Sequence, residues 1–401
     1  MQPIHPFMSE ARPSLMEPWP AMEIPTPNPF LLLPQPPMNF FGCDVIVEDL
    51  LGFVERSESI TLLGAAGTGK TAIALTLLHH SRISARFGHR RYFMRCRGLE
   101  SSLDEFVRRL SEAIGARYPK DMAQLQSHLS TSPRRILVVD GVECILDPLA
   151  PGAAGITSAI EEFSRCQNLC LLLTSKMDVR MAGFRRVKMP KLSANGAQDM
   201  FYSRCCLEGS AEVDNILEEL DSHPFSIDLL ASAVSENVWD KATLLEVWDG
   251  GKASILKVCG CQSPEDNIKL ALCTPTIRDH GMAALETLRA LAALPNGIEE
   301  RELENTFPEI AGTGDATDAL RMFFLVYRQD GRIKMLSPFR LYFLASGQTL
   351  VSDSASDITC DTVAENIQYT PQDIFGFGLL FSFYQPCFSR VTNASFNLRT
   401  A

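Results

Sequence analysis

The sequence lacks any apolar run long enough to cross a lipid bilayer. Its longest apolar stretch is Ile374–Phe381, far shorter than the roughly 18 residues that a transmembrane helix needs. Met1–Met8 contains no Lys or Arg ahead of an apolar segment, so the start of the chain does not look like a secretory signal peptide. We therefore expect no membrane association and a cytoplasmic location.

Cysteine-based sites are missing as well. The 12 cysteines form no Cys-x-x-Cys pair, and the 7 histidines do not gather near them. This distribution argues against a zinc site and against a disulfide framework, and it favours a reducing compartment.

Positive charge is scarce. The chain has 37 Lys and Arg residues against 48 Asp and Glu residues, which gives a formal net charge of -11. Because an acidic molecule repels nucleic acid, we expect no nucleic-acid partner. We interpret the arginine-rich stretch Arg82–Arg97 as a solvated face rather than a nucleic-acid patch. Any phosphate-binding function must then come from a local site.

Composition and length predict a globular protein of several domains. Of the 401 residues, 46% are hydrophobic and 21% are charged, and this length corresponds to about two to four domains. Proline is concentrated in residues 1–37, which we expect to form a disordered leader, because proline cannot donate a backbone hydrogen bond. Residues 347–401 show no pattern that assigns them to a fold.

Residues 38–192 alternate apolar strand patterns with amphipathic helix patterns. The expected strands are Ser59–Leu63, Arg91–Cys96, Ile136–Val139, Leu169–Thr174 and Arg186–Met189. Continuous apolar strands separated by helices indicate a parallel sheet that is covered on both faces. We therefore predict an α/β domain of three layers.

The strand pattern disappears after Ser193. Helices are expected over 193–204, 211–221, 225–237, 241–249 and 264–273, so residues 193–275 form a predicted helical domain. Further helices over 281–294, 299–306 and 315–325 precede the strands Leu325–Arg328 and Arg332–Met335, which flank Asp330-Gly331. Helices followed by a hairpin with an Asp-Gly turn predict a winged-helix-like domain over 276–346.

One segment carries a strong functional motif. It reads Gly64-Ala65-Ala66-Gly67-Thr68-Gly69-Lys70-Thr71 and matches the Walker A pattern between a predicted strand and a predicted helix. Glycines let backbone N–H groups curl around an anion at a helix N-terminus. We expect Lys70 to reach the β- and γ-phosphates of ATP and Thr71 to hold Mg²⁺.

Two acidic residues follow the next buried strand. Asp140 ends the strand Ile136–Val139, where a Walker B acid would hold the metal. Glu143 lies three residues later, where it would polarise the attacking water; the alternative is a solvated carboxylate in the first turn of a helix.

Two further segments leave their interpretation open. Thr174-Ser175-Lys176 follows a buried strand, where a polar residue would sense the γ-phosphate, although a lysine there is as often a solvated charge. His223-Pro224 opens a predicted helix, and proline in a first helical turn needs no functional explanation.

The ordered set of these motifs resembles the STAND class of P-loop NTPases, and more narrowly the NB-ARC/NACHT-type modules of fungal NOD-like proteins. The likeness covers residues 38–346 and depends mainly on Ile60–Leu78, Ile136–Asp147, Leu171–Lys176 and Asp221–Ala231. It implies a nucleotide domain, a helical domain and a winged helix that close over ADP.

The resemblance also implies a function. In this class ADP holds the module closed, while ATP opens it and allows homo-oligomers to form. Carried over to this chain, Lys70 and Thr71 contact phosphate and Mg²⁺, Asp140 is the Walker B acid, Lys176 occupies the sensor position and Pro224 packs on the adenine.

Three positions depart from that family pattern. Gly42-Cys43 stands where the family has Gly-Arg, Lys176 replaces the sensor arginine, and Met335-Leu336-Ser337 stands where the family has Met-His-Asp. Lysine keeps the charge of arginine but not its bidentate fork, and the histidine that contacts the ADP phosphate is missing.

Three functional hypotheses follow. The first is an ATP/ADP-binding switch with slow or vestigial hydrolysis. The second is a P-loop ATPase that turns over, for which Glu143 is the evidence. The third is a degenerate interaction module that keeps the fold without a functional cycle, for which Cys43, Lys176 and Leu336 are the evidence.

Overall fold

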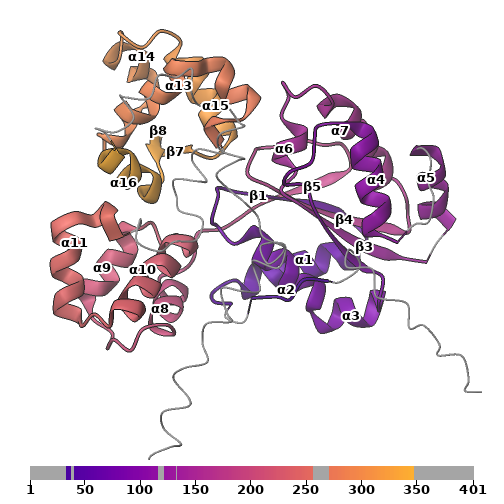
Figure 1. The fold of residues 1–401 in the computed structure, drawn as a ribbon, viewed down its shortest axis with the longest axis horizontal. Coiled ribbons are helices and arrows are strands. Elements are labelled where there is room, and N and C mark those ends of the chain that lie inside the picture. Colours follow the sequence, from indigo (N-terminus) through magenta and orange to yellow (C-terminus); the bar gives the residue numbers. More distant parts are fainter. Residues whose placement is uncertain (1–32, 38–39, 116–121, 132, 256–270, 347–401) are drawn as a thin grey trace, which may run out of the picture.

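A computed structural model describes residues 33–37, 40–115, 122–131, 133–255 and 271–346 (Figure 1). Most of the predicted leader, the tail over 347–401 and nearly all of the predicted helix over 264–273 lie outside the described residues. Two residues of the predicted leader contact the domain that follows. Leu33 packs against an apolar cluster of that domain, and the Pro34 carbonyl oxygen accepts a hydrogen bond from His79 Nε2 at 2.8 Å.

A five-stranded parallel sheet forms the centre of the first domain. Its strands are β1 (Ser59–Leu63), β2 (Arg91–Arg95), β3 (Arg135–Asp140), β4 (Leu169–Ser175) and β5 (Phe184–Lys188), in the order β2-β3-β4-β1-β5. Every residue of β1 and β4 is buried, as their unbroken apolar sequences predict for strands covered on both faces. The prediction of a P-loop NTPase α/β fold is confirmed.

Helices cover both faces of this sheet (Figure 1). One face carries α1 (Asp44–Glu55), α2 (Lys70–His79) and α3 (Ser81–Phe87), and the other carries α4 (Leu103–Ala113), α5 (Met122–Thr131), α6 (Glu143–Leu146) and α7 (Ala153–Ser164). Successive strand residues serve opposite faces: Leu172 joins the α1–α3 cluster, whereas Leu171 and Leu173 join the other.

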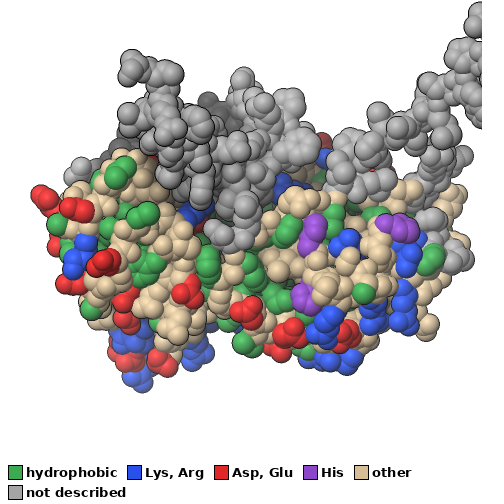
Figure 2. Space-filling view, turned by 90° about the horizontal axis from the view of Figure 1, so that it is seen from below, with side chains coloured by type: hydrophobic (Ala, Val, Ile, Leu, Met, Phe, Trp, Pro, Cys, Tyr) green, Lys and Arg blue, Asp and Glu red, His purple; other side chains and the backbone are tan. Residues whose placement is uncertain are grey.

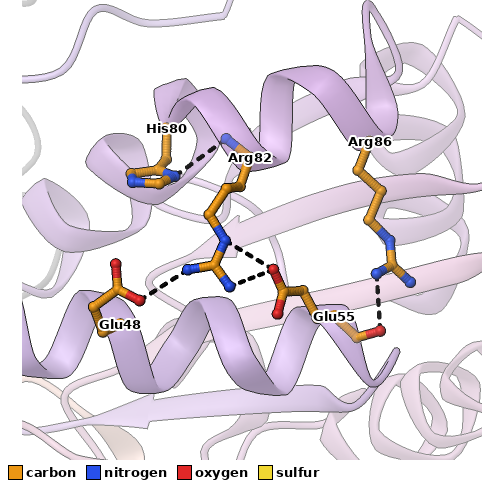
Figure 3. A network of polar contacts seen from close by, with 5 residues as sticks. All are labelled: Glu48, Glu55, His80, Arg82 and Arg86. Atoms are coloured by element: carbon orange, nitrogen blue, oxygen red, sulfur yellow. Dashed lines mark hydrogen bonds and ion pairs between the residues drawn. The ribbon is translucent and has the colours of Figure 1, made fainter.

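The sequence did not predict α3, because the chain leaves α2 and enters α3 within one residue. His80 has an extended ψ of 140 and accepts a hydrogen bond from the Arg82 amide, which begins the new helix. Arg82 then bonds to Glu48 and Glu55 of α1, and Arg86 donates to the Glu55 carbonyl oxygen (Figure 3). These arginines pair within the domain.

Charges of both signs are mixed on the face seen from below. In Figure 2, Lys and Arg side chains lie next to Asp and Glu side chains along the lower rim rather than in one block of a single sign. In the part of the chain that the structure describes, no helix is both long and apolar enough to span a bilayer.

Four helices follow the sheet and enclose an apolar cluster of their own. They are α8 (Ala194–Tyr202), α9 (Ala211–Glu219), α10 (Pro224–Asn237) and α11 (Lys241–Ile255). The Ser193 and Ser210 hydroxyls cap α8 and α9 by accepting from the Gly196 and Val213 amides, which explains where these helices begin. Phe201, Leu230 and Trp248 are buried between the helices.

The remaining described segment combines helices with a small antiparallel sheet. It comprises α13 (Pro275–Ala292), β6 (Ile298–Glu299), η2 (Glu300–Glu302), α14 (Leu303–Thr306), α15 (Thr313–Met322), β7 (Val326–Gln329), β8 (Arg332–Met335) and α16 (Ser337–Ser346). The sheet order is β6-β8-β7. Asp330 and Gly331 both have positive φ in the β7–β8 turn, as the Asp-Gly sequence predicts. The sequence missed β6, because two residues show no periodicity.

Two carboxylates join these segments. Asp147, 1% exposed, accepts from the Thr276 hydroxyl at 2.6 Å and from the Thr276 amide at 3.2 Å, so the first domain caps α13. Asp221 Oδ2 accepts from the Ser337 amide at 2.8 Å and so caps α16. Apolar residues of α13, α15 and α16 belong to the same buried cluster as α4–α7.

Candidate functional site

The Walker A residues form a loop at the carboxyl end of the central sheet. They follow β1, which lies between β4 and β5, and the loop ends where α2 begins at Lys70. Gly67 and Gly69 have φ values of 78° and 89°, a region that favours glycine. The carboxyl edge of a parallel sheet next to a helix N-terminus is a position that suits phosphate.

Lys70 lies under the loop that it follows. Its Nζ donates to the carbonyl oxygens of Gly64 at 2.8 Å and Ala65 at 2.7 Å, and the residue is 6% exposed. Burial, reinforced by the positive charge of Lys176 and opposed by Glu143 and Asp140, lowers the pKa of Lys70 to about 7. The amine therefore lies against two carbonyl oxygens of the loop, and its pKa is low enough for its charge to change near neutral pH.

We expect nucleotide binding to take up a proton at pH 8. A Lys70 with a pKa of about 7 is mostly neutral at that pH, and a phosphate anion beside it would raise its pKa and restore the charge. Calorimetry in two buffers of different ionisation enthalpy should show uptake of about one proton per nucleotide at pH 8 and much less at pH 6. Equal binding enthalpies in both buffers at pH 8 would contradict this.

Asp140, Thr71 and Thr174 form a compact group at the ends of β3 and β4. The hydroxyls of Thr71 and Thr174 donate to Asp140 Oδ1 at 2.7 Å and 2.6 Å, and the Thr174 hydroxyl accepts from the Gly141 amide at 2.9 Å. A threonine hydroxyl and a carboxylate oxygen that meet in this way are the hard oxygen donors that Mg²⁺ takes together with substrate phosphates. The residues present therefore fit a magnesium ion.

Among the residues that the structure describes, no three His, Cys, Asp or Glu side chains are placed to hold a metal ion.

The structure gives Thr174 a different contact from the one that its sequence suggested. The sequence placed a γ-phosphate sensor in Thr174-Ser175-Lys176, but Thr174 is 1% exposed and its hydroxyl holds Asp140. The Ser175 hydroxyl is buried and bonds to the backbone of Met177. Of the three residues, Thr174 and Ser175 are buried and Lys176 is half-buried.

Glu143 lies beside the same group at the start of α6. Its Oε2 accepts from the Lys176 amide at 3.1 Å, and the electrostatic influence of its carboxylate reaches Lys70. Glu143 stands in the first turn of α6, as the alternative supposes, and its side chain is half-buried and bonded to another element.

Sequence reasoning did not bring His223 and Phe225 into the site. The structure places them on the phosphate loop: His223 Nε2 is 2.9 Å from the Ala66 carbonyl oxygen, and the Phe225 amide donates to the Gly67 carbonyl oxygen at 3.2 Å. Pro224, between them, is half-buried. The sequence hinted at a close contact on the loop through Gly67, because the Walker A pattern does not require a glycine at that position.

The other departures from the family pattern lie at junctions between segments. Cys43 is half-buried and packs against both the α1–α3 cluster and the α8–α11 cluster. Leu336 packs against the cluster shared by α4–α7 and the last segment, and the amide of Ser337 after it donates to Asp221.

Comparison with known proteins finds one family model that is similar to part of the first domain. Residues 54–183 match the family model described as an AAA domain. No curated protein sequence matches the chain.

Three solved structures are similar to this chain at low sequence identity. The Walker-type ATPase paby2304 of Pyrococcus abyssi is 16% identical with a TM-score of 0.54, over 79% of this chain and 99% of that chain. A STAND protein of Pyrococcus horikoshii with a tetratricopeptide repeat sensor is 12% identical with a TM-score of 0.39, over 86% of this chain and 49% of that chain. The Thermotoga maritima RuvB branch migration motor is 14% identical with a TM-score of 0.36, over 76% and 95%. The likeness to the Pyrococcus abyssi ATPase shows a common fold.

Proposed function

We propose that this chain, whose residues 54–183 form an AAA-type P-loop NTPase domain, binds ATP and ADP with Mg²⁺ and acts as a nucleotide-dependent switch with slow hydrolysis. The observation that supports a switch is the direct bonding of His223 and Phe225, at the start of α10, to the carbonyl oxygens of the phosphate loop. A segment that touches the loop can respond to what the loop binds.

In this proposal each residue of the site has a role. The backbone amides of Gly64–Thr71 and the Lys70 amine hold the phosphates, while Thr71 and Asp140 hold Mg²⁺, which would neutralise charge on the β- and γ-phosphates. Lys176 faces the γ-phosphate as a sensor. Pro224 packs on the adenine, as the resemblance to NB-ARC/NACHT-type STAND modules implies.

Slow hydrolysis is supported by the position of Glu143. Its Oε2 accepts a hydrogen bond from the Lys176 amide, and this bond restrains the movement of the carboxylate toward a water molecule next to the γ-phosphate. Lys176 itself supplies a point charge, without the bidentate contacts of arginine.

The second and third segments complete the proposed switch. We propose that α8–α11 form the helical domain and that α13–α16 with β6-β8-β7 form a winged-helix-like domain. Asp147 and Asp221 cap α13 and α16 directly, so closure does not require the family histidine that Leu336 replaces. ATP would release these caps and allow homo-oligomers to form.

The test is the nucleotide content of the purified protein. The protein is purified in low salt and denatured, and the released ADP and ATP are quantified by chromatography. We expect close to one bound nucleotide per chain, mostly ADP. A protein that carries no nucleotide and whose melting temperature does not rise with added ATP and Mg²⁺ would support the degenerate module instead.

The turnover ATPase is distinguished by its rate. Steady-state phosphate release of several molecules per second that is lost in Glu143→Gln would favour that alternative over the switch.

A further inference from the structure

A buried histidine connects the phosphate loop to the rest of the chain. His223 is 5% exposed. Its Nε2 lies 2.9 Å from the Ala66 carbonyl oxygen, and its Nδ1 lies 3.1 Å from the Ser226 hydroxyl. Its ring also meets the ring of Phe339 on α16 edge-on, with the centroids 6.4 Å apart. One side chain thus touches the loop, α10 and α16.

The hydrogen bonds define which nitrogen carries the proton. A carbonyl oxygen can only accept, so Nε2 must donate to Ala66, and Nδ1 is left to accept from the Ser226 hydroxyl. The imidazole is then neutral and fully bonded. Burial also lowers its pKa to about 4, which keeps this form throughout the neutral range.

The contact is close enough to dictate a glycine in the loop. A Cβ added at Gly67 would lie 2.7 Å from His223 Cε1 and 2.7 Å from the Phe225 Cβ, closer than non-bonded carbon atoms approach. The Walker A pattern alone leaves this position open. The glycine at position 67 therefore makes room for α10 as well as for the turn of the loop.

We infer that His223 is a positioning residue that couples the phosphate loop to α10 and α16. Its ring holds the Ala66 carbonyl oxygen, and the Phe225 amide holds the Gly67 carbonyl oxygen. Together these two hydrogen bonds fix the loop so that the loop amides face the phosphates. Linkage then requires the reverse effect: nucleotide on the loop strengthens the docking of α10. This inference rests on the proposed function.

The test compares His223→Gln, which retains a donor, with His223→Leu, which fills similar space but cannot donate. Without added nucleotide, hydrogen exchange at the Phe225 amide and in residues 64–71 should be faster in His223→Leu than in the wild type. Affinity for a fluorescent ATP analogue should fall about tenfold, as expected for a buried carbonyl that loses its partner. His223→Gln should lie close to the wild type in both measurements.

His79→Leu is the matched control. His79 also bonds to one carbonyl oxygen, that of Pro34, but on the far end of α2, so this change should leave loop exchange and affinity unaltered.

Gly67→Ala disturbs the same contact from the loop side, and it replaces His223→Leu as the test if that variant does not fold. It should also accelerate exchange at Phe225. Gly98→Ala controls for strain, because Gly98 has a φ of +79° and nothing within 4 Å of the added Cβ.

Two results would overturn the role of His223. One is unchanged exchange in His223→Leu, and the other is faster exchange with unchanged nucleotide affinity, which would leave a purely structural contact. A wild-type protein that binds no nucleotide would instead overturn the proposed function, and the exchange comparison would still decide whether His223 docks α10 on the loop.

Discussion

Lys70→Ala should lower the affinity for ATP and ADP by at least about 100-fold, because the change removes the only cationic side chain of the loop and its charge-assisted hydrogen bonds to phosphate. The Lys70 amine lies within 2.8 Å of two loop carbonyl oxygens, so it already stands where the phosphates of a bound nucleotide would meet the loop. Titration of a fluorescent nucleotide in the presence of Mg²⁺ measures the effect.

The control is Lys188→Ala, which removes an exposed lysine from the edge strand β5. It should leave the affinity unchanged, which separates loss of a site residue from loss of one positive charge. Thermal unfolding of both variants reports whether the fold survives. A Lys70→Ala protein that folds and binds nucleotide as tightly as the wild type would refute the assignment of the phosphate loop.

The second large effect is expected on stability. Gly152→Ala should lower the free energy of unfolding by about 3 kcal/mol or more, the range of severe steric substitutions in a packed region. An added Cβ would lie 1.9 Å from the Ser101 carbonyl oxygen. The φ of Gly152 is -98°, which any residue can adopt, so the predicted loss comes from the clash with backbone alone.

Gly155→Ala, within the helix α7 that Gly152 precedes, provides the comparison. The atom nearest to its added Cβ is Leu103 Cδ2 at 3.9 Å, an ordinary contact, and alanine within a helix is favoured over glycine by about 0.5–1 kcal/mol. Urea unfolding should therefore give opposite signs for the two variants. Equal stability of Gly152→Ala and the wild type would show that the loop before α7 can move away from Ser101.

The strands of the central sheet show how much of the fold could be predicted from the sequence. Ser59–Leu63 and Leu169–Thr174 were predicted as buried parallel strands because each is apolar without interruption, and both are found within one residue of those limits. The phosphate loop and Asp140 were located because their spacing obeys a chemical requirement. By contrast, α6 and β6 are too short to show a period, and α3 was missed because a capping bond at His80 divides a continuous helical pattern.

The residues of the candidate site also fall into a group that the sequence predicts and a group that it does not. Residues that act through local geometry, such as Gly69, Lys70 and Thr71, can be identified from the chain alone, because loop and helix follow one another. Residues that act through contacts across the fold cannot. Nothing near Thr174 shows that its hydroxyl will hold Asp140, and nothing near His223 shows that its ring will meet Ala66.

Hydrophobic period and motif spacing are local properties of the chain, so they were enough to predict the sheet, the phosphate loop and the acid that faces it. Which other segments touch that loop depends on how the whole chain packs. The pairing of His223 with Ala66 joins residues separated by 157 positions, and that of Asp147 with Thr276 joins residues separated by 129. Such contacts form because a buried polar group needs a hydrogen-bond partner, and these partners come within reach only after the chain has folded.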